Sequence, residues 1–165
     1  MKKSIYEYSL KRTKVMEFRE HEKFNTPLNV YKFLRTIKLD EEEQEHMMVI
    51  VLNAGNNIKA CYTVSIGLID STQAHSREVF RLAILYGASR IILAHNHPSG
   101  STDPSSEDIK RTNALVQAGK IIGIEILDHI IIGNGFYSFR EAGKMEVDTD
   151  CEAWKVQYQM EVNLK

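Results

Sequence analysis

Short apolar runs recur along this chain of 165 residues, and their length is the feature that most limits its fold. Met47 to Leu52 and Ile130 to Ile132 are two such runs, and both are far too short to cross a bilayer. Runs of this length suit buried strands, and the segments between them carry apolar residues at helical spacing. The chain is therefore expected to alternate strands and helices, with no membrane span.

Turn and cap residues mark where these elements start and stop. Thr26 and Pro27 suit the N-cap and first position of a helix, and Gly87 suits a left-handed helix end. Ser105 begins a further helix that is predicted to end at Gly119. The predicted elements are helices over 27–37, 76–86 and 105–119, and strands over 46–52, 58–66, 91–94, 121–132 and 136–138. This order predicts an α/β (α+β) fold, a mixed sheet flanked by helices.

Composition excludes several classes of protein. The chain is 43% hydrophobic and 26% charged with a net charge of -1, as in an ordinary globular domain without a global basic field for nucleic acid. No apolar stretch of signal-peptide length follows the first lysines. Cys61 and Cys151 lie far apart in no metal-binding spacing, which fits a reducing compartment. We therefore expect a cytoplasmic protein without membrane association.

The two ends of the chain alternate apolar and polar residues. Tyr6, Tyr8 and Leu10 alternate near the start, and Trp154 to Leu164 does so near the end. Strict period-two patterning predicts strands, and isolated strands must pair. We expect these two to pair within one chain or across a homodimer, and the alternative is a disordered C-terminus. The predicted organisation is an N-terminal extension over 1–25, a domain over 26–145 and a C-terminal extension over 146–165.

One segment carries residues suited to chemistry. His95 and His97 lie two apart at the exit of the 91–94 strand, so both imidazoles face the same side. Asp108 lies one turn into the next helix, with Ser105 as its N-cap. Two histidines and one carboxylate leave a fourth tetrahedral position for water. This pattern is typical of a catalytic zinc site.

Each of these residues also has a plain structural explanation. Ser105 and Asp108 are spaced as an N-cap and the third residue of a capping box, with the carboxylate favoured by the helix dipole. A histidine at a strand end is commonly just hydrogen-bonded. The combination of His-x-His with Ser-x-x-Asp favours a metal site over these separate explanations.

The spacing His95, His97, Ser105 and Asp108 matches the JAMM motif of the MPN metallopeptidase superfamily. The segments 76–80, 95–100 and 127–133 resemble its bacterial RadC-like branch, and the resemblance covers about residues 26 to 143. It implies a mixed sheet with flanking helices, related to the cytidine deaminases. RadC-like proteins often carry an N-terminal helix-hairpin-helix segment thought to contact DNA. Residues 1 to 25 contain no glycine-centred helical hairpin, which weakens the expectation of DNA binding.

The resemblance implies a zinc-dependent hydrolase acting on peptide or isopeptide bonds of a peptide or protein substrate. Zn2+ would be held by three residues: His95, His97 and Asp108. Glu45, just before the 47–52 strand, resembles the family's glutamate that acts on the attacking water, and Ser105 would stabilise the oxyanion. Two alternatives for Glu45 are open: it belongs to a solvated acidic run, or Glu78 is the base.

Three other functions compete with hydrolysis. A non-enzymatic accessory protein of DNA repair or of a mobile element is the runner-up. A cytidine deaminase fails because position 97 is His and no Pro-Cys-x-x-Cys follows. An iron oxygenase has compatible ligands but gives no role to Ser105 or Glu45. Of the other histidines, His129 is expected to be a satisfied core residue, and His75 to border the pocket.

Overall fold

In the part of the chain that the structure describes, five strands form one sheet in the order β2-β1-β3-β4-β5. The computed structural model describes residues 23–67 and 75–146. Its strands are β1 (His46–Leu52), β2 (Ile58–Ile66), β3 (Arg90–Asn96), β4 (Glu125–Gly133) and β5 (Gly135–Ser138). Its helices are α1 (Pro27–Thr36), the short 3-10 helix η1 (Leu39–Glu41), α2 (Ser76–Leu85) and α3 (Ser106–Ile122).

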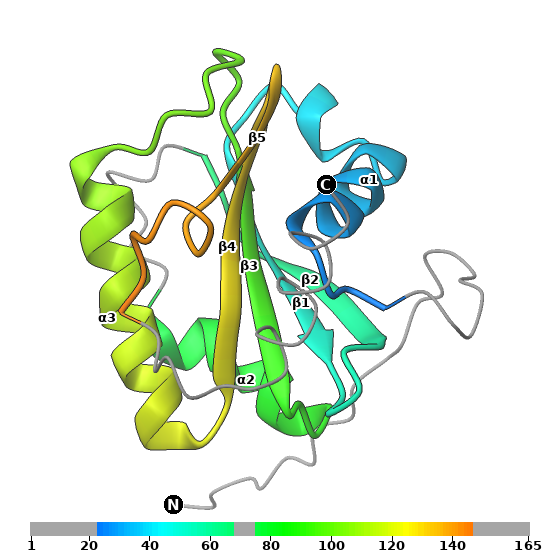
Figure 1. Ribbon diagram of the computed structural model, residues 1–165, viewed down its shortest axis with the longest axis vertical. Helices are drawn as coiled ribbons and strands as arrows, with labels where there is room; N and C mark the ends of the chain where they lie inside the picture. The colour runs from blue at the N-terminus through cyan, green and yellow to red at the C-terminus, as the bar shows by residue number, and fades with distance from the viewer. Residues whose placement is uncertain (1–22, 68–74, 147–165) are drawn as a thin grey trace, which may run out of the picture.

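The sheet is mixed, as the element order predicts. β1 is antiparallel to both β2 and β3, β3 is parallel to β4, and β4 is antiparallel to β5. Parallel neighbours need a long connection, and α3 supplies it between β3 and β4. The loop that leaves β3 and the turn between β4 and β5 consequently meet at one end of the sheet (Figure 1).

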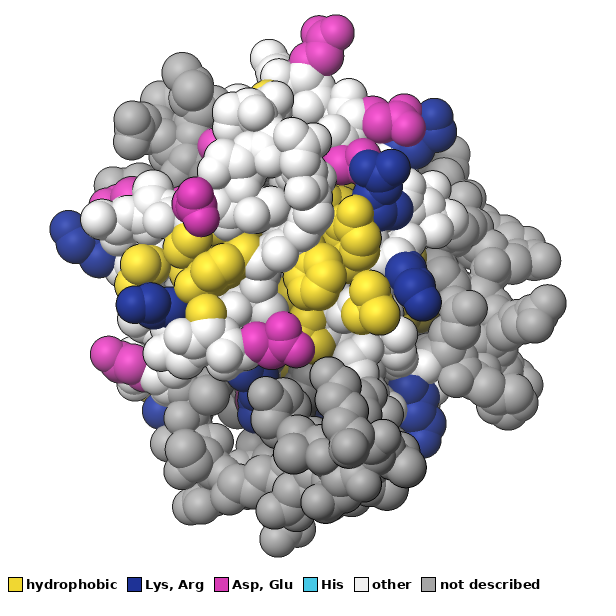
Figure 2. Space-filling model, turned by 45° about the horizontal axis from the view of Figure 1, so that its top comes forward, with side chains coloured by type: hydrophobic (Ala, Val, Ile, Leu, Met, Phe, Trp, Pro, Cys, Tyr) yellow, Lys and Arg dark blue, Asp and Glu magenta, His cyan; other side chains and the backbone are white. Residues whose placement is uncertain are grey.

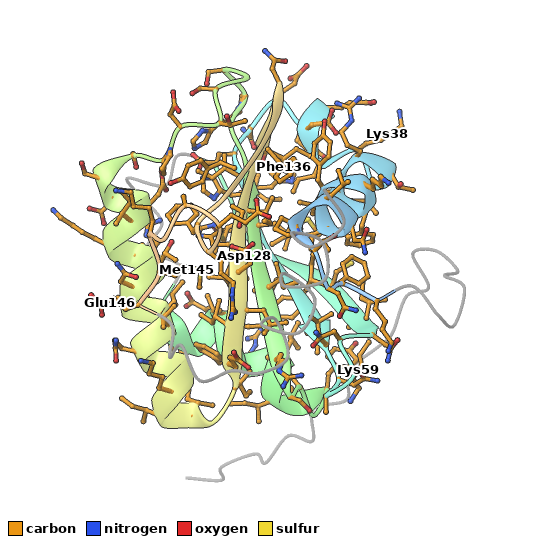
Figure 3. The ribbon with its side chains drawn as sticks, in the orientation of Figure 1. Lys38, Lys59, Asp128, Phe136, Met145 and Glu146 are labelled. Carbon is orange, nitrogen blue, oxygen red and sulfur yellow. The ribbon has the colours of Figure 1, made fainter. Side chains whose placement is uncertain are left out.

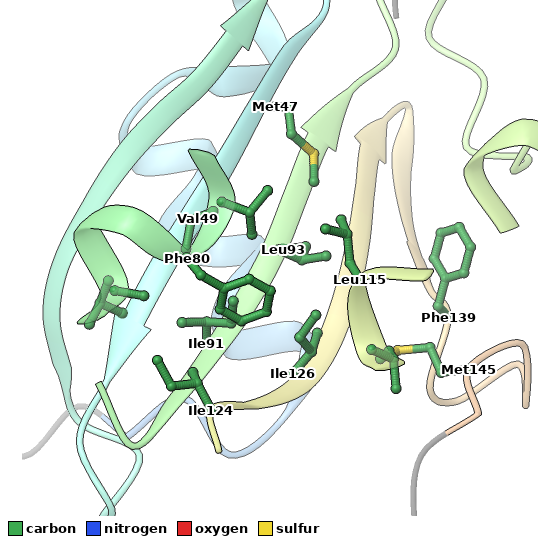
Figure 4. Close-up of a cluster of buried hydrophobic side chains, with 14 of the residues drawn as sticks. Met47, Val49, Phe80, Ile91, Leu93, Leu115, Ile124, Ile126, Phe139 and Met145 are labelled. Atoms are coloured by element: carbon green, nitrogen blue, oxygen red, sulfur yellow. The ribbon is translucent and has the colours of Figure 1, made fainter. Parts of the chain in front are cut away.

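Helices cover both faces of the sheet, α1 on one side and α2 with α3 on the other (Figure 1). Alternate strand residues therefore enter two separate cores. On the α1 face the core contains Leu34, Ile50, Ile92 and Ile130. On the α2 and α3 face it contains Phe80, Val49, Ile91, Leu93 and Leu115. Figure 4 shows Phe80 pointing into this second core beside Ile91.

The start of α1 confirms the cap prediction. Thr26 is the N-cap, its hydroxyl oxygen accepts from the amide of Asn29 at 3.3 Å, and Pro27 is the first helical residue. Gly87 follows α2 with φ +59°, the left-handed conformation that glycine adopts without steric cost.

The predicted boundary between α3 and β4 is wrong. The helix runs through Gly119 to Ile122 and ends at Gly123, whose φ of 79° is left-handed. Gly119 is a contact residue: a Cβ there would lie 2.6 Å from the backbone oxygen of Ile124. The first glycine permits close packing and the second ends the helix, so β4 starts only at Glu125.

β3 is longer than predicted and contains the first histidine. Pairing with β1 extends to His95, opposite Met47, and pairing with β4 extends to Asn96, opposite Ile132. His95 is fully buried as a result, and only His97 lies beyond the strand.

A buried carboxylate joins β4 to the segment after β5. Asp128 accepts from the amide of His129 at 2.7 Å, the hydroxyl of Ser138 at 2.6 Å and the amide of Arg140 at 3.0 Å. Figure 3 shows Asp128 in the interior of the molecule. Burial raises the pKa of Asp128 to about 7 against the effect of these donors. These bonds hold the backbone of His129, whose ring lies 2.8 Å from that of His95.

The predicted strands at the two ends of the chain lie outside the described residues, as does Cys151. Within residues 23–67 and 75–146, none of the helices has the length and apolar character that crossing a membrane requires.

Candidate metal centre

Two imidazoles converge where β3 ends. His95 belongs to β3 and His97 is the first residue after it, and the two imidazoles face the same point as predicted, with their Nε2 atoms 3.0 Å apart. Both face α3, as Leu93 does two residues earlier. The buried end of β3 therefore presents two nitrogen ligands at one point.

Two carboxylates approach the same point from different elements. Asp108, in the first turn of α3, places Oδ1 3.8 Å from Nε2 of His95 and Oδ2 3.9 Å from Nε2 of His97. Glu45, the residue before β1, places Oε1 3.7 Å from Nε2 of His95. Glu45, His95 and His97 form a group with ligand atoms within 4.8 Å of one another, close enough to hold one metal ion.

The spacing of these donors fits a small tetrahedral ion. Ligands at about 2.0–2.1 Å from a tetrahedral zinc lie about 3.3 Å from one another. The observed separations are 3.0 Å between the two nitrogens and 3.7 to 3.9 Å from nitrogen to carboxylate oxygen. Imidazole and carboxylate are both ordinary zinc ligands. The site therefore fits a metal ion in size and in donor type.

Each ring has a hydrogen-bond partner on its Nδ1 side, and its Nε2 faces the Nε2 of the other ring. Nδ1 of His97 lies 3.1 Å from the backbone oxygen of Ser101, which can only accept, so Nδ1 carries the proton. Nδ1 of His95 lies 2.8 Å from Nε2 of His129. Burial lowers the pKa of His95 to about 4, so the neutral ring that a metal needs is favoured near neutral pH.

Ser105 and Asp108 form the capping box that their spacing predicts. The amide of Asp108 donates to the Ser105 hydroxyl oxygen at 3.1 Å, and the Ser105 amide donates to Oδ2 of Asp108 at 2.8 Å. The Ser105 hydroxyl also donates to Oδ2 at 2.6 Å. Capping and proximity to the histidines therefore occur together, because the box fixes the carboxylate that faces them.

Asn96 anchors the segment that carries Glu45. Its amide nitrogen donates to the backbone oxygens of Glu42 at 3.1 Å and Gln44 at 2.9 Å, and its oxygen accepts from the amide of His46 at 2.7 Å. Asn96 lies between the two histidines in the sequence, and its side chain is buried. The strand that bears the histidines thus also fixes the backbone on both sides of Glu45.

The structure separates Glu45 from the rest of its acidic run. Residues 41–44 are exposed, whereas Glu45 is half-buried beside His95. Glu78, the other candidate base, has a side chain that is 40% exposed, and its carboxylate accepts from the amide of His75 at 2.9 Å. His75 borders a pocket of about 340 Å³ that Glu107 and Arg111 also line, and none of the five predicted site residues lines this pocket.

The sequence did not predict that Asn96, Thr112 and His129 support the site through their hydrogen bonds. His129 is a satisfied core residue as predicted, 3% exposed, and it also bonds His95. Its place on the same face as His95 follows from the pairing of β4 with β3, which a single strand pattern does not reveal. Asn96 carried a usable signal, since a polar residue on the opposite face of a buried strand needs hydrogen-bond partners.

The end of the molecule that bears the β3–α3 loop has a mixed surface. Figure 2 shows apolar side chains exposed in the middle of this face, with acidic and basic side chains interspersed around them. Among the described residues seen there, no single sign of charge dominates. A uniform basic surface for a phosphate backbone is absent from this view of the described residues.

Comparisons with known proteins give a family match over most of the chain. The family model of the RadC-like JAB domain matches residues 24–144. A UPF0758 protein of Rubrobacter xylanophilus is 42% identical over 121 residues, covering 73% of this chain and 53% of that protein. One of Chlorobium phaeovibrioides is 46% identical over 118 residues, covering 71% and 52%. One of Caldanaerobacter subterraneus is 53% identical over 92 residues, covering 56% and 40%. The chain spans about half the length of these relatives.

Proposed function

Because this chain belongs to the RadC-like JAB domain family, we propose that it is a zinc-dependent hydrolase that cleaves peptide or isopeptide bonds. The observation that supports this most strongly is the convergence of two imidazole nitrogens, 3.0 Å apart, with two carboxylates. Such a set of donors supplies both metal ligands and a base. The partner would be a peptide or a protein that presents an extended segment to this end of the sheet.

We assign the metal to His95, His97 and Asp108. The group whose single ligand atoms lie within 4.8 Å of one another contains Glu45 in place of Asp108. Asp108 approaches the two histidines with different oxygens, Oδ1 at 3.8 Å from His95 and Oδ2 at 3.9 Å from His97, and we assign it as the third ligand because of the family resemblance and its burial. Its side chain is only 6% exposed, against 17% for Glu45, and the bonds from Ser105 hold it in place. A bound zinc would polarise the scissile carbonyl and lower the pKa of the attacking water.

Glu45 then has the position of a general base. Its carboxylate lies beside the histidine pair, and its side chain is more exposed than that of Asp108. In the proposed reaction Glu45 accepts a proton from the attacking water and later delivers it to the leaving amine. Asn96 supports this role by fixing the backbone before and after Glu45.

Ser105 is proposed to stabilise the oxyanion that forms on the attacked carbonyl. Its hydroxyl lies at the start of α3, where the helix dipole also favours negative charge. The hydroxyl proton now points at Asp108, and this bond must exchange for one to the oxyanion during the reaction. Ser105 would thus serve both the helix and the reaction.

The proposal is tested by incubating the zinc-loaded chain with a bacterial proteome-derived peptide library and identifying new termini by mass spectrometry. We expect cleavage by the wild type and by Glu78→Gln, and none by Glu45→Gln or after chelation. Equal cleavage in all arms would show a contaminant, and no cleavage in any arm would contradict the proposal. Salt-sensitive DNA binding without cleavage would favour the accessory role instead.

A further inference from the structure

A chain of four buried groups connects the proposed ligand Asp108 to the proposed ligand His95. The hydroxyl of Thr112 lies 2.6 Å from the backbone oxygen of Asp108, one turn earlier in α3. The same hydroxyl oxygen lies 2.7 Å from Nδ1 of His129, and Nε2 of His129 lies 2.8 Å from Nδ1 of His95. All four residues are at most 5% exposed, so water does not compete for these bonds.

The backbone oxygen of Asp108, at the start of this series of hydrogen bonds, determines the direction of each bond in the series. A backbone oxygen only accepts, so Thr112 uses its single proton on Asp108. The hydroxyl oxygen must then accept from Nδ1 of His129. A neutral imidazole has one N–H, and therefore Nε2 of His129 accepts from Nδ1 of His95.

We propose that Thr112 and His129 are positioning residues that hold His95 with its proton on Nδ1, so that Nε2 presents its lone pair to the metal. The inference rests on the proposed function in that it takes His95 to be a metal ligand. Histidine ligands in metal sites commonly donate their second nitrogen to a carboxylate, carbonyl or water. Here the acceptor is another imidazole, and its own orientation comes from the helix that carries Asp108.

The surroundings of His129 hold it in place within the hydrogen-bonded series Asp108, Thr112, His129 and His95, which we call the relay. Its ring stacks on Phe139 with centroids 4.7 Å apart and an interplanar angle of 13°. Its backbone amide is bound by Asp128 at 2.7 Å. With the ring plane and backbone both fixed, the nitrogen that meets His95 cannot turn away without breaking the stack.

The test is a long-range 1H–15N NMR spectrum of the zinc-loaded full chain, which reports which nitrogen of each histidine carries the proton. We expect Nδ1 of His95 and Nδ1 of His129 to be protonated in the wild type. Thr112→Val removes the hydroxyl at nearly constant shape and should shift His129 away from this pattern. Thr112→Ser should restore it. A wild-type His129 without a proton on Nδ1, or an unchanged spectrum in Thr112→Val, would overturn the proposal.

Zinc affinity provides a second readout. Competition with a chromophoric chelator should show about 10- to 100-fold weaker binding in Thr112→Val, with recovery in Thr112→Ser. Thr36→Val is the matched control, because Thr36 makes the same bond to the oxygen of Lys32, at 2.8 Å, on α1. Equal affinity in Thr112→Val and the wild type would also overturn the relay. Neither readout needs a substrate, so failure of the hydrolase proposal would be seen separately.

Discussion

The first turns of α2 and α3 share one local design. In each helix an acidic third residue reaches back to the amide of the N-cap residue. Glu78 accepts from His75 at 2.9 Å in α2, and Asp108 accepts from Ser105 at 2.8 Å in α3. As helix starts, the two are nearly equivalent, because each carboxylate satisfies an amide that would otherwise lack a partner.

The two carboxylates differ in what they face. The side chain of Glu78 is 40% exposed and lies 3.4 Å from Arg77, whereas Asp108 is 6% exposed and lies against two histidines. The loop over 97–105 connects β3 to α3, and the first turn of α3 lies beside the two imidazoles. The local capping motif alone does not distinguish the start of α2 from the start of α3. Only the carboxylate of α3 belongs to a candidate site, because the histidines of β3 and the following loop lie beside it.

The largest expected difference between the two helix starts is in metal affinity. Asp108→Ala removes a proposed ligand and should weaken zinc binding by more than about 100-fold, beyond what loss of a supporting residue costs. Glu78→Ala should leave the affinity unchanged. Competition with a chromophoric chelator measures both. If Asp108→Ala bound zinc as tightly as Glu78→Ala did, Asp108 would serve only its helix.

The next difference concerns turnover. Glu45→Gln should retain zinc while the rate of hydrolysis falls by at least about 100-fold, the usual contribution of a general base. Glu78→Gln should keep the rate within about twofold, since exposed substitutions of this kind are mild. The measurement is kcat on any peptide that the wild type cleaves. A comparable loss in the two variants would return Glu78 to consideration as the base.

A smaller effect is expected from the N-cap hydroxyls. Ser105→Ala should lower the free energy of unfolding by about 1 kcal/mol, and Thr26→Ala in α1 should cost a similar amount. Only Ser105→Ala should also lower kcat, because only that hydroxyl lies beside the proposed ligands. Urea unfolding and the peptide assay separate the two effects. An equal kcat in both variants would limit Ser105 to capping.

The smallest effect concerns the pH dependence of α2. The amide of His75 is the main reason that the pKa of Glu78 lies below its usual 4.5, so ionised Glu78 favours the folded state. This contribution is present above pH 4.5 and is lost as pH falls through the folded pKa. The Tm difference between wild type and Glu78→Gln should therefore be small at pH 7 and vanish at low pH. A difference that grew on acidification would contradict this.

The elements were predictable where side chains mark them locally. Thr26 and Pro27 start α1, and Gly87 follows α2, because each fixes a backbone conformation by its own chemistry. The boundary at Gly119 was not predictable, since that glycine is set by contact with Ile124 and not by a turn. Local rules cannot separate these two uses of glycine.

The candidate site was predictable to the extent that its spacing is regular. His95 and His97 alternate on one strand, and Ser105 and Asp108 fall one helical turn apart, so both pairs follow from element geometry. Thr112 and His129 meet only because α3 packs on β4. Such contacts depend on tertiary packing, for which the isolated segments carry no periodic signal.

The zinc content of the chain, purified without chelator and measured by elemental analysis, tests the central claim most directly. The account predicts one zinc ion per chain in the wild type, almost none in His95→Ala, and undiminished zinc in Glu78→Ala. A wild-type chain that stayed metal-free in the presence of zinc, or a His95→Ala chain with full zinc content, would contradict it.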